Sequence, residues 1–397
     1  MGWDERIARP YLKLYYREPE ACRQLIAGAE VVMFGGTDEE SYIEARLEAG
    51  KPVIRYSERL YKTGQWKAVS PRGLRKKYYD HTRYRRASVY LLCAGAYVAS
   101  DFRIVRAYPG KMYCWGYFPE TRHYDVEKLL AGKGWRRTEA PEGNGGRGEE
   151  PWTPYLLWAA RMIDWKHPEL PMETARHLKE KGIAFHMDII GGGDMLEELE
   201  AMRREYGLEA EVGLPGFLKP EKVREYMEKA DIFLFTSDRQ EGWGAVANEA
   251  MNSGCALAAD HMIGAVPYLV RHGENGMIYK DGNREELFAL AETLAGDREL
   301  CRSLGRKAYE TITECWNPEN AAERLALLCV KLGLLEREEL EIADLDEKQK
   351  NFDREGETFS GKKSSDRVWG FAPCRPAPVI KERTAYRLCR REGDENR

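Results

Sequence analysis

The sequence has little that points to a metal site, a disulfide framework or a membrane span. Its nine cysteines form no CxxC pair and no cluster with histidine, and the seven histidines make no HExxH pattern. The longest apolar stretch, Ala87 to Ser100, is shorter than the roughly 20 residues that span a bilayer. The first twenty residues lack the apolar core of a signal peptide. We therefore expect a cytoplasmic protein without a metal site, because free cysteines are typical of a reducing compartment.

Charge and catalytic motifs exclude further classes. The net charge is only −4, so nothing in the overall composition indicates a nucleic-acid partner. Neither a Gly-x-Ser-x-Gly motif nor a Walker-type phosphate loop is present. The one GxGxxG match, Gly143 to Gly148, lies in a polar stretch with no strand before it. Hydrolase, nucleoside triphosphatase and dehydrogenase functions therefore have little support.

Two regions of alternating helix and strand patterns predict two α/β domains. In the first region, the helical segments 20–29, 38–50 and 85–102 lead to the strand-like segments 29–36, 51–56 and 103–118. In the second, strand-like 154–161, 184–194, 209–217 and 231–235 alternate with helical 171–182, 195–207 and 221–230. Later helices are predicted over 284–295 and 320–332. This alternation is typical of parallel sheets with helices on their faces.

Composition sets the predicted boundaries. Residues 1–130 form the first domain, and the glycine-rich, polar segment 131–152 forms a linker. Residues 153–332 form the second domain. Residues 333–397 are a charged tail that we expect to be partly disordered, with a more apolar closing segment that docks on the rest of the protein.

Between Asp231 and Gly254 the sequence combines features suited to a sugar nucleotide. An apolar strand is followed by a polar turn with Gly242 and Gly244. Glycine leaves room for a ligand beside the backbone. A helix that begins near Ala245 offers unpaired N–H groups to a diphosphate.

Two carboxylates flank the start of this helix. Glu241 precedes the helix and Glu249 lies within it, on the order of 10 Å apart given about 1.5 Å of rise per helical residue. Carboxylates accept hydrogen bonds from sugar and ribose hydroxyls. Because 66 of the 397 residues are acidic, the pair alone fits a solvated helix surface equally well.

Three further features have both a functional and a purely structural interpretation. Arg161 and Lys166 follow a strand at a spacing that suits one anionic group, although alone they are more simply explained as surface charges. Gly191 and Gly192 end a strand, and they either admit a nucleotide close to the backbone or only make a turn. Trp243 either walls a sugar pocket or packs inside the domain.

The ordered set of motifs resembles the retaining GT-B glycosyltransferases of glycosyltransferase family 4, the glycosyl transferases group 1. The resemblance covers about Pro154 to Leu332, through AAR, DWK, IIGGGD, VGLPGF, EKADIFLFTS, EGWG, NEAMNSG and ENGMIY in the family's order. It implies an α/β fold with two Rossmann-like, doubly wound domains that face a cleft. The first domain would lie on the acceptor side, and the second would bind the nucleotide sugar.

The resemblance also implies how the donor is held. The residues it assigns are Arg161, Lys166, Gly244 and Ala245 for the diphosphate; Glu241, Gly242 and Trp243 for the donor sugar; Glu249 for the ribose; and Gly191 with Gly192 for a nucleotide backbone contact. Glu241 is the implied catalytic residue. The two cations would stabilise the leaving diphosphate in place of a metal, so no cofactor is expected.

The N-terminal region departs from the family pattern. Only about thirty residues precede the first clear strand, so the leading strand and its glycine-rich loop are expected to be missing and the domain incomplete. Many relatives carry a histidine near the reacting sugar, but this chain has Tyr56, Ser57, Glu58 and Arg59 there. We assign no catalytic histidine.

The segment from Pro71 to Arg86 interleaves basic residues with tyrosines. It fits a solvated helix face, a surface that meets anionic lipid, or, least well, a nucleic-acid patch. If it meets lipid, Arg72 to Arg86 would hold the protein at the inner face of the membrane.

We therefore predict a hexosyltransferase that moves a sugar from a nucleoside-diphosphate donor to a saccharide or lipid-linked acceptor with retention, in polysaccharide or envelope glycan synthesis. Two alternatives stay open. One is a non-catalytic nucleotide-binding homologue, and the other is a sugar-nucleotide epimerase of related fold.

Overall fold

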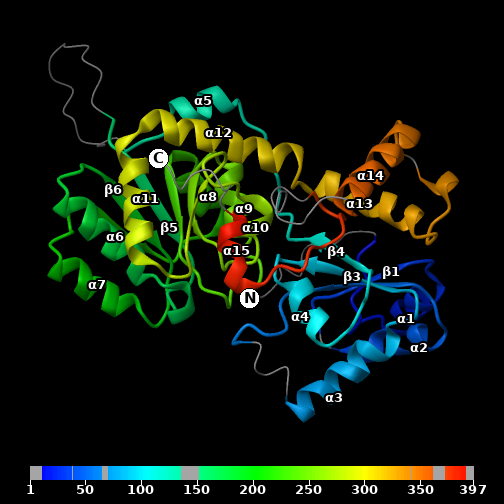
Figure 1. The fold of residues 1–397 in the computed structure, drawn as a ribbon. Helices are drawn as coiled ribbons and strands as arrows, with labels where there is room; N and C mark the ends of the chain where they lie inside the picture. Colours follow the sequence, from blue (N-terminus) through cyan, green and yellow to red (C-terminus); the bar gives the residue numbers. More distant parts are fainter. Residues whose placement is uncertain are drawn as a thin grey trace.

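The computed structural model describes residues 11–37, 39–64, 70–135, 152–340, 342–360 and 372–389. These residues form two parallel β-sheets with helices packed on their faces (Figure 1). Residues 136–151 of the predicted linker 131–152, which include Gly143 to Gly148, lie outside the described residues, as do parts of the tail. The predicted domain boundaries therefore stay predictions.

The N-terminal sheet has four parallel strands in sequence order, β1-β2-β3-β4. Its elements are α1 (Pro19–Gly28), β1 (Val32–Phe34), α2 (Glu44–Glu48), β2 (Val53–Ser57), α3 (Pro71–Asp80), β3 (Val89–Ala94), α4 (Val98–Ile104), β4 (Met112–Trp115) and α5 (Val126–Ala131). The expectation of one helical segment over 85–102 is wrong. Its first part is the buried strand β3, and Gly95, at φ +123°, separates that strand from α4.

The C-terminal sheet has six parallel strands in the order β10-β9-β8-β5-β6-β7. Its elements are β5 (Tyr155–Ala159), α6 (Glu169–Glu180), β6 (His186–Ile190), α7 (Leu196–Glu205), β7 (Val212–Gly216), α8 (Pro220–Lys229), β8 (Ile232–Phe235), α9 (Val246–Asn252), β9 (Ala256–Asp260), α10 (Val266–Leu269), β10 (Met277–Tyr279), α11 (Arg284–Gly296) and α12 (Arg298–Glu314). From β5 the chain first winds outward through β6 and β7, then returns to build β8, β9 and β10 on the other side. The order of the strands thus reverses between β5 and β8, the point where ligands of such sheets bind.

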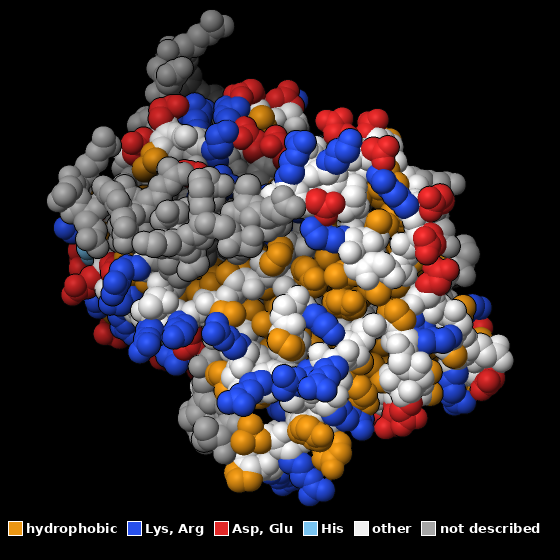
Figure 2. Space-filling model, turned by 45° about the vertical axis from the view of Figure 1, so that its right-hand side comes forward, with side chains coloured by type: hydrophobic (Ala, Val, Ile, Leu, Met, Phe, Trp, Pro, Cys, Tyr) orange, Lys and Arg blue, Asp and Glu red, His pale blue; other side chains and the backbone are white. Residues whose placement is uncertain are grey.

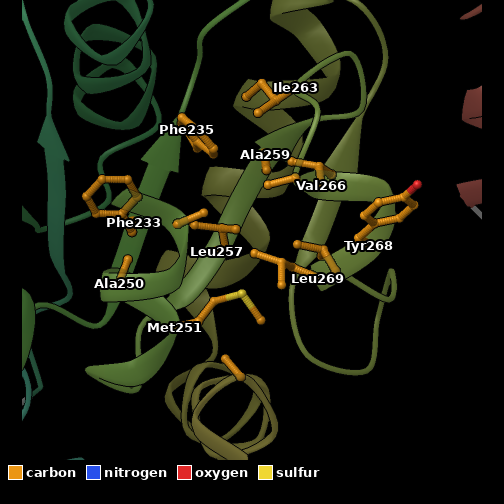
Figure 3. Packing of buried hydrophobic residues seen from close by; sticks show 14 of the residues in the cluster. Phe233, Phe235, Ala250, Met251, Leu257, Ala259, Ile263, Val266, Tyr268 and Leu269 are labelled. Carbon is orange, nitrogen blue, oxygen red and sulfur yellow. The ribbon is translucent and has the colours of Figure 1, made fainter. Parts of the chain in front are cut away.

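Both faces of the C-terminal sheet are buried, which explains its apolar strands. Along β8, Phe233 and Phe235 face one hydrophobic cluster, while Ile232 and Leu234 face the other. Figure 3 shows the first cluster, where Phe233 lies near Ala250 of α9, and Leu257 of β9 lies between them and the side chains of α10. Because neither face meets water, the strand reads as a continuous apolar run.

The last helices return to the N-terminal sheet. Leu327 and Leu328 of α13 (Pro318–Lys331) pack with Ile54, Leu92 and Trp115 of that sheet. α14 (Leu345–Ser360) follows α13 and packs beside it, with Phe352 in the same cluster (Figure 1). One face of the N-terminal sheet is therefore covered by chain that comes after the second sheet.

The closing segment of the tail spans both halves. Cys114 of β4 donates its N–H to the carbonyl of Arg375 at 2.7 Å, and Ala377 donates to Met112 at 2.9 Å, which covers the edge of β4. The chain then enters α15 (Glu382–Cys389), which lies between the two sheets in Figure 1. There the hydroxyl of Tyr386 donates to Glu286 of α11 at 2.7 Å. Residues 372–389 thus connect the N-terminal sheet to the C-terminal half.

Candidate functional site

The loops after β5 and β8 meet at the point where the strand order reverses. The backbone N–H of Asp238 donates to the carbonyl of Trp165 at 3.0 Å. The hydroxyl of Thr236 donates to the carbonyl of Lys166 at 2.9 Å and accepts from the indole N–H of Trp158. Because Thr236 is buried, these bonds hold the two loops together.

The cation and the carboxylate predicted for the donor lie together in this site. The Lys166 ammonium forms an ion pair with Glu241, and the Ser237 hydroxyl donates to the same Glu241 oxygen at 3.1 Å. Both charged side chains are only 12% exposed. The Trp165 ring makes cation–π contacts with both cations, since Lys166 Nζ lies 4.4 Å and the Arg161 guanidinium carbon 5.9 Å from its centre. The structure therefore brings Arg161, Lys166 and Glu241 into one cluster.

His167 adds a third positive charge beside Lys166. Its ring nitrogens lie 2.8 Å from a Glu169 oxygen and 3.8 Å from an Asp238 oxygen. The carboxylates of Asp238 and Glu169 raise the pKa of His167 to about 10, against the opposing effect of burial. Its φ of +51° is left-handed, which marks the tight turn out of the Lys166 segment. The imidazole is therefore protonated at neutral pH.

Close contacts around the Glu241 loop require glycine at Gly244, Gly264 and Gly95. A Cβ at Gly244, whose φ is +91°, would lie 2.3 Å from the Phe235 ring. A Cβ on Gly264 would lie only 1.7 Å from the carbonyl oxygen of Gly242, and a Cβ on Gly95 would lie 2.5 Å from the same oxygen. Gly95 belongs to the N-terminal half, so this loop is fixed at the junction of the two halves.

Trp243 packs inside the protein. Its side chain is fully buried, its indole N–H donates to Asn248 at 2.9 Å, and its ring contacts Tyr268 and Trp316. Gly116 lies directly against the ring, since a Cβ there would be 2.3 Å away. In this conformation the Trp243 side chain therefore has no exposed surface with which to contact a donor sugar. It packs inside the domain, which is the second of the two interpretations of this residue.

Ala245 and Glu249 lie at the start of α9. Ala245 caps this helix, and the Glu249 carboxyl lies one turn inside, half-buried. Burial raises the pKa of Glu249, although Arg224 and Arg122 act in the opposite direction. Arg224 also donates to the Glu249 carbonyl at 3.2 Å.

The glycines after β6 permit the neighbouring loop to approach. A Cβ at Gly191, at φ +152°, would lie 1.9 Å from the Ala160 carbonyl oxygen. The Gly192 carbonyl accepts the N–H of Met162 at 3.0 Å. Gly191 is therefore needed to seat the loop that carries Arg161, whereas a Cβ at Gly192 would make only an ordinary contact, 3.8 Å from Phe217. The nucleotide contact of these two glycines stays a prediction.

A carboxylate from the N-terminal half, Glu58, lies opposite Gly242. A Cβ at Gly242 would be 2.2 Å from a Glu58 oxygen. Glu58 accepts hydrogen bonds from the Tyr117 hydroxyl and from Lys62, each at 2.6 Å. Sequence reasoning found the position but gave it no role, because only the tertiary structure places β2 beside the loop after β8.

No group of His, Cys, Asp and Glu side chains suited to a metal ion occurs in the part of the chain that the structure describes. None of the described helices combines the length and the apolar character needed to cross a lipid bilayer. None of the nine cysteines forms a disulfide.

Comparisons with known proteins support a glycosyltransferase. Residues 147–311 match the family model described as Glycosyl transferases group 1. A candidate colanic acid biosynthesis glycosyltransferase, WcaL, of Salmonella typhimurium is 28% identical over 179 residues, 44% of this chain and 44% of its own length. The amylovoran biosynthesis glycosyltransferase AmsK of Erwinia amylovora is 31% identical over 140 residues, 34% of either chain. The matches thus span less than half the length of these relatives.

Solved structures extend the likeness across both sheets. Anabaena HepE, determined with UDP and glucose, aligns with a TM-score of 0.53 at 16% identity over 80% of this chain and 84% of its own. Sucrose-phosphate synthase of Thermosynechococcus elongatus aligns with a TM-score of 0.57 at 16% identity, over 82% and 80%. The fold is that of the GT-B glycosyltransferases. The predicted fold class is confirmed, and Arg161, Lys166 and Glu241 lie within the residues that the family model matches.

Proposed function

We propose that this chain is a glycosyltransferase that moves a hexose-type sugar from a nucleoside-diphosphate sugar to a saccharide or lipid-linked acceptor with retention of configuration. The observation that carries the proposal is the cluster of Arg161, Lys166 and Glu241 where the strand order of the C-terminal sheet reverses. The names of the relatives, which concern colanic acid and amylovoran synthesis, support a role in polysaccharide or envelope glycan assembly. Retention rests on the motif resemblance.

In the proposed complex, Arg161 and Lys166 bind the donor diphosphate. The free N–H groups near Gly244 and Ala245 assist them, because a helix start carries a partial positive charge. Glu249 accepts hydrogen bonds from the ribose, and the backbone at Gly191 and Gly192 lies beside the nucleotide. Trp243 takes an indirect part, because its buried ring, packed against Gly116, Tyr268 and Trp316, anchors the loop inside the protein.

The Lys166 and Glu241 pair implies an exchange of partners on binding. Without donor, each group neutralises the other in a nearly enclosed site. When the donor binds, its negative diphosphate becomes the partner of Lys166. Glu241 is then free to accept hydrogen bonds from hydroxyls of the donor sugar. As the bond between sugar and phosphate breaks, the fixed cations stabilise the charge that grows on the leaving diphosphate. Preorganised positive charge thus accelerates the reaction, and Glu241 orients the sugar.

The acceptor is proposed to bind on the N-terminal half. A cavity of about 110 Å³ lies at the carboxyl ends of β1 and β2, and polar side chains line much of it. The lining includes Thr37, Glu40, Arg55, Ser57 and Asp80. Arg55 and Glu40 form a two-bond ion pair there, at 2.7 and 2.6 Å. Such groups suit the hydroxyls of a saccharide.

The basic segment from Arg72 to Arg86 is proposed to meet anionic lipid at the inner face of a membrane. In α3 and the turn after it, exposed Leu74, Tyr78 and Tyr79 accompany arginines and lysines. Figure 2 shows basic and hydrophobic side chains together on the lower part of this face, where α3 lies. Each cation near such a surface contributes about 1 kcal/mol. Binding to vesicles with anionic lipid should weaken as salt rises; binding that ignores both salt and lipid charge would reject this contact.

The proposed function is tested by sugar-nucleotide turnover. Glu241→Gln keeps the size of the side chain but removes its charge, and we expect the rate of nucleoside-diphosphate release to fall by about 10²-fold. Lys166→Met should weaken nucleoside-diphosphate binding about tenfold or more, since a hydrogen bond to a charged group contributes about 1.5–3 kcal/mol. Glu221→Gln, at an exposed position of α8, is the matched control. Unchanged turnover in Glu241→Gln would contradict the assignment, and nucleotide binding by the wild type without any transfer would favour a binding protein.

A further inference from the structure

Glu58 is the carboxylate that the N-terminal half presents to the donor loop. It follows β2 directly, at the carboxyl end of that strand. One of its oxygens lies 2.2 Å, and its carboxyl carbon 2.4 Å, from the position that a Cβ on Gly242 would occupy. Glu58 thus lies directly over the backbone next to Glu241, although the two residues belong to different sheets.

Two hydrogen bonds hold this carboxylate in one orientation. The Tyr117 hydroxyl donates to Oε1 and the Lys62 ammonium donates to Oε2, both at 2.6 Å. Burial and the hydrogen bond to Glu58 raise the pKa of Tyr117, so its hydroxyl stays protonated and donates. Tyr117 is itself supported, because its ring packs edge-on against Tyr56 and Trp243. Lys62 is 41% exposed and is the weaker of the two constraints.

The arrangement leaves Glu58 able to accept more hydrogen bonds. An ionised carboxylate has about four acceptor sites, and the two bonds described use one on each oxygen. Its side chain is 27% exposed, in contrast to the fully buried Arg59 that follows it. A carboxylate that only tied the two halves together would need a donor from the C-terminal half. Among the residues that the structure describes, the donors to the Glu58 carboxylate are Tyr117 and Lys62, which both belong to the N-terminal half.

We propose that Glu58 binds hydroxyls of the transferred sugar from the N-terminal half, so that the sugar contacts two carboxylates, Glu58 and Glu241, from the two halves of the protein. This inference rests on the proposed function. The nucleoside diphosphate lies outside this contact, since its proposed partners are all in the C-terminal half. Glu58 therefore adds affinity for the sugar nucleotide and not for the diphosphate alone.

The test compares two affinities in the full chain. Calorimetry with UDP, GDP, UDP-glucose and GDP-mannose first identifies a diphosphate and a sugar nucleotide of the same base that the wild type binds. The readout is the ratio of the two affinities, which a general loss of folding does not change. Glu58→Gln should lower the relative affinity for the sugar nucleotide about tenfold, while the affinity for the diphosphate stays within about twofold.

Controls separate this role from a structural one. Glu48→Gln, at an exposed position of α2, should leave the ratio unchanged. Glu58→Asp withdraws the carboxylate by one methylene and should also lower the ratio, provided that its melting temperature matches the wild type. An unchanged ratio in Glu58→Gln, or an equal loss for both ligands, overturns the inference. If the wild type binds none of the four ligands, the proposed function fails and Glu58 loses its role with it.

Discussion

Gly264→Ala is a sharp test of how the site is built. Gly264 lies after β9, and its Cα faces the carbonyl oxygen of Gly242 so closely that an added Cβ would be 1.7 Å from that oxygen. An ordinary contact is about 3.5 Å, so the two backbones must move apart by about 1.8 Å. Neither group is the end of a flexible side chain. The strain therefore falls on the loop that carries Glu241.

The same displacement disturbs the junction of the two halves. The Gly264 carbonyl accepts the N–H of Ala96 at 2.9 Å, and Gly264 itself donates to the Glu241 carbonyl at 3.3 Å. Overpacking of this kind costs about 1–3 kcal/mol. A misplacement of about 1 Å near the chemistry lowers rates about 10²-fold. Gly264→Ala should therefore lose turnover to a much larger extent than it loses stability.

Gly296→Ala is the matched control. Gly296 ends α11, and a Cβ there would meet nothing within 4 Å, so its melting temperature and turnover should stay at or above the wild-type values. Thermal melting and the rate of nucleoside-diphosphate release are measured for both variants. A Gly264→Ala protein with wild-type turnover would refute the reasoning, because it would mean that the Glu241 loop tolerates displacement.

Two further predictions concern charges. Asp238→Asn should lower the pKa of His167 from about 10 toward its ordinary value of 6.5, which NMR titration of the imidazole measures. Because the raised pKa belongs to the folded state, the stability that His167 contributes in the wild type is full below pH 6.5 and is lost as pH rises through about 10. A wild-type free energy of unfolding that stays constant between pH 6.5 and about 10 would contradict this contribution of His167. Glu382→Ala should lower the free energy of unfolding by roughly 1.5–3 kcal/mol, since it removes a carboxylate partner of the buried Arg59. Denaturant unfolding measures this change. An unchanged midpoint would show that α15 does not secure the two halves.

Local pattern was sufficient for much of the C-terminal half. The apolar run at β8, the glycines after it and the helix from Val246 all lie where the sequence predicts them. The predicted helix over 284–295 corresponds to α11. By contrast, the sequence pattern does not predict α12, from Arg298 to Glu314, and it predicts a helix where the structure has β3. Residues 89–99 of that segment, VYLLCAGAYVA, form a continuous run without charge, and such a run has no period that distinguishes a buried strand from a buried helix.

The sequence by itself determined the fold class and the candidate donor residues, because periodicity and motif order are local properties of the chain. Only the tertiary structure decided how these residues meet. In the folded chain Lys166 pairs with Glu241, Trp243 is buried, and Glu58 lies against Gly242. The last contact joins residues far apart in the chain, and no local spacing encodes such a contact. It depends on the strand order and on the packing of one sheet against the other, which are fixed only when the whole chain folds.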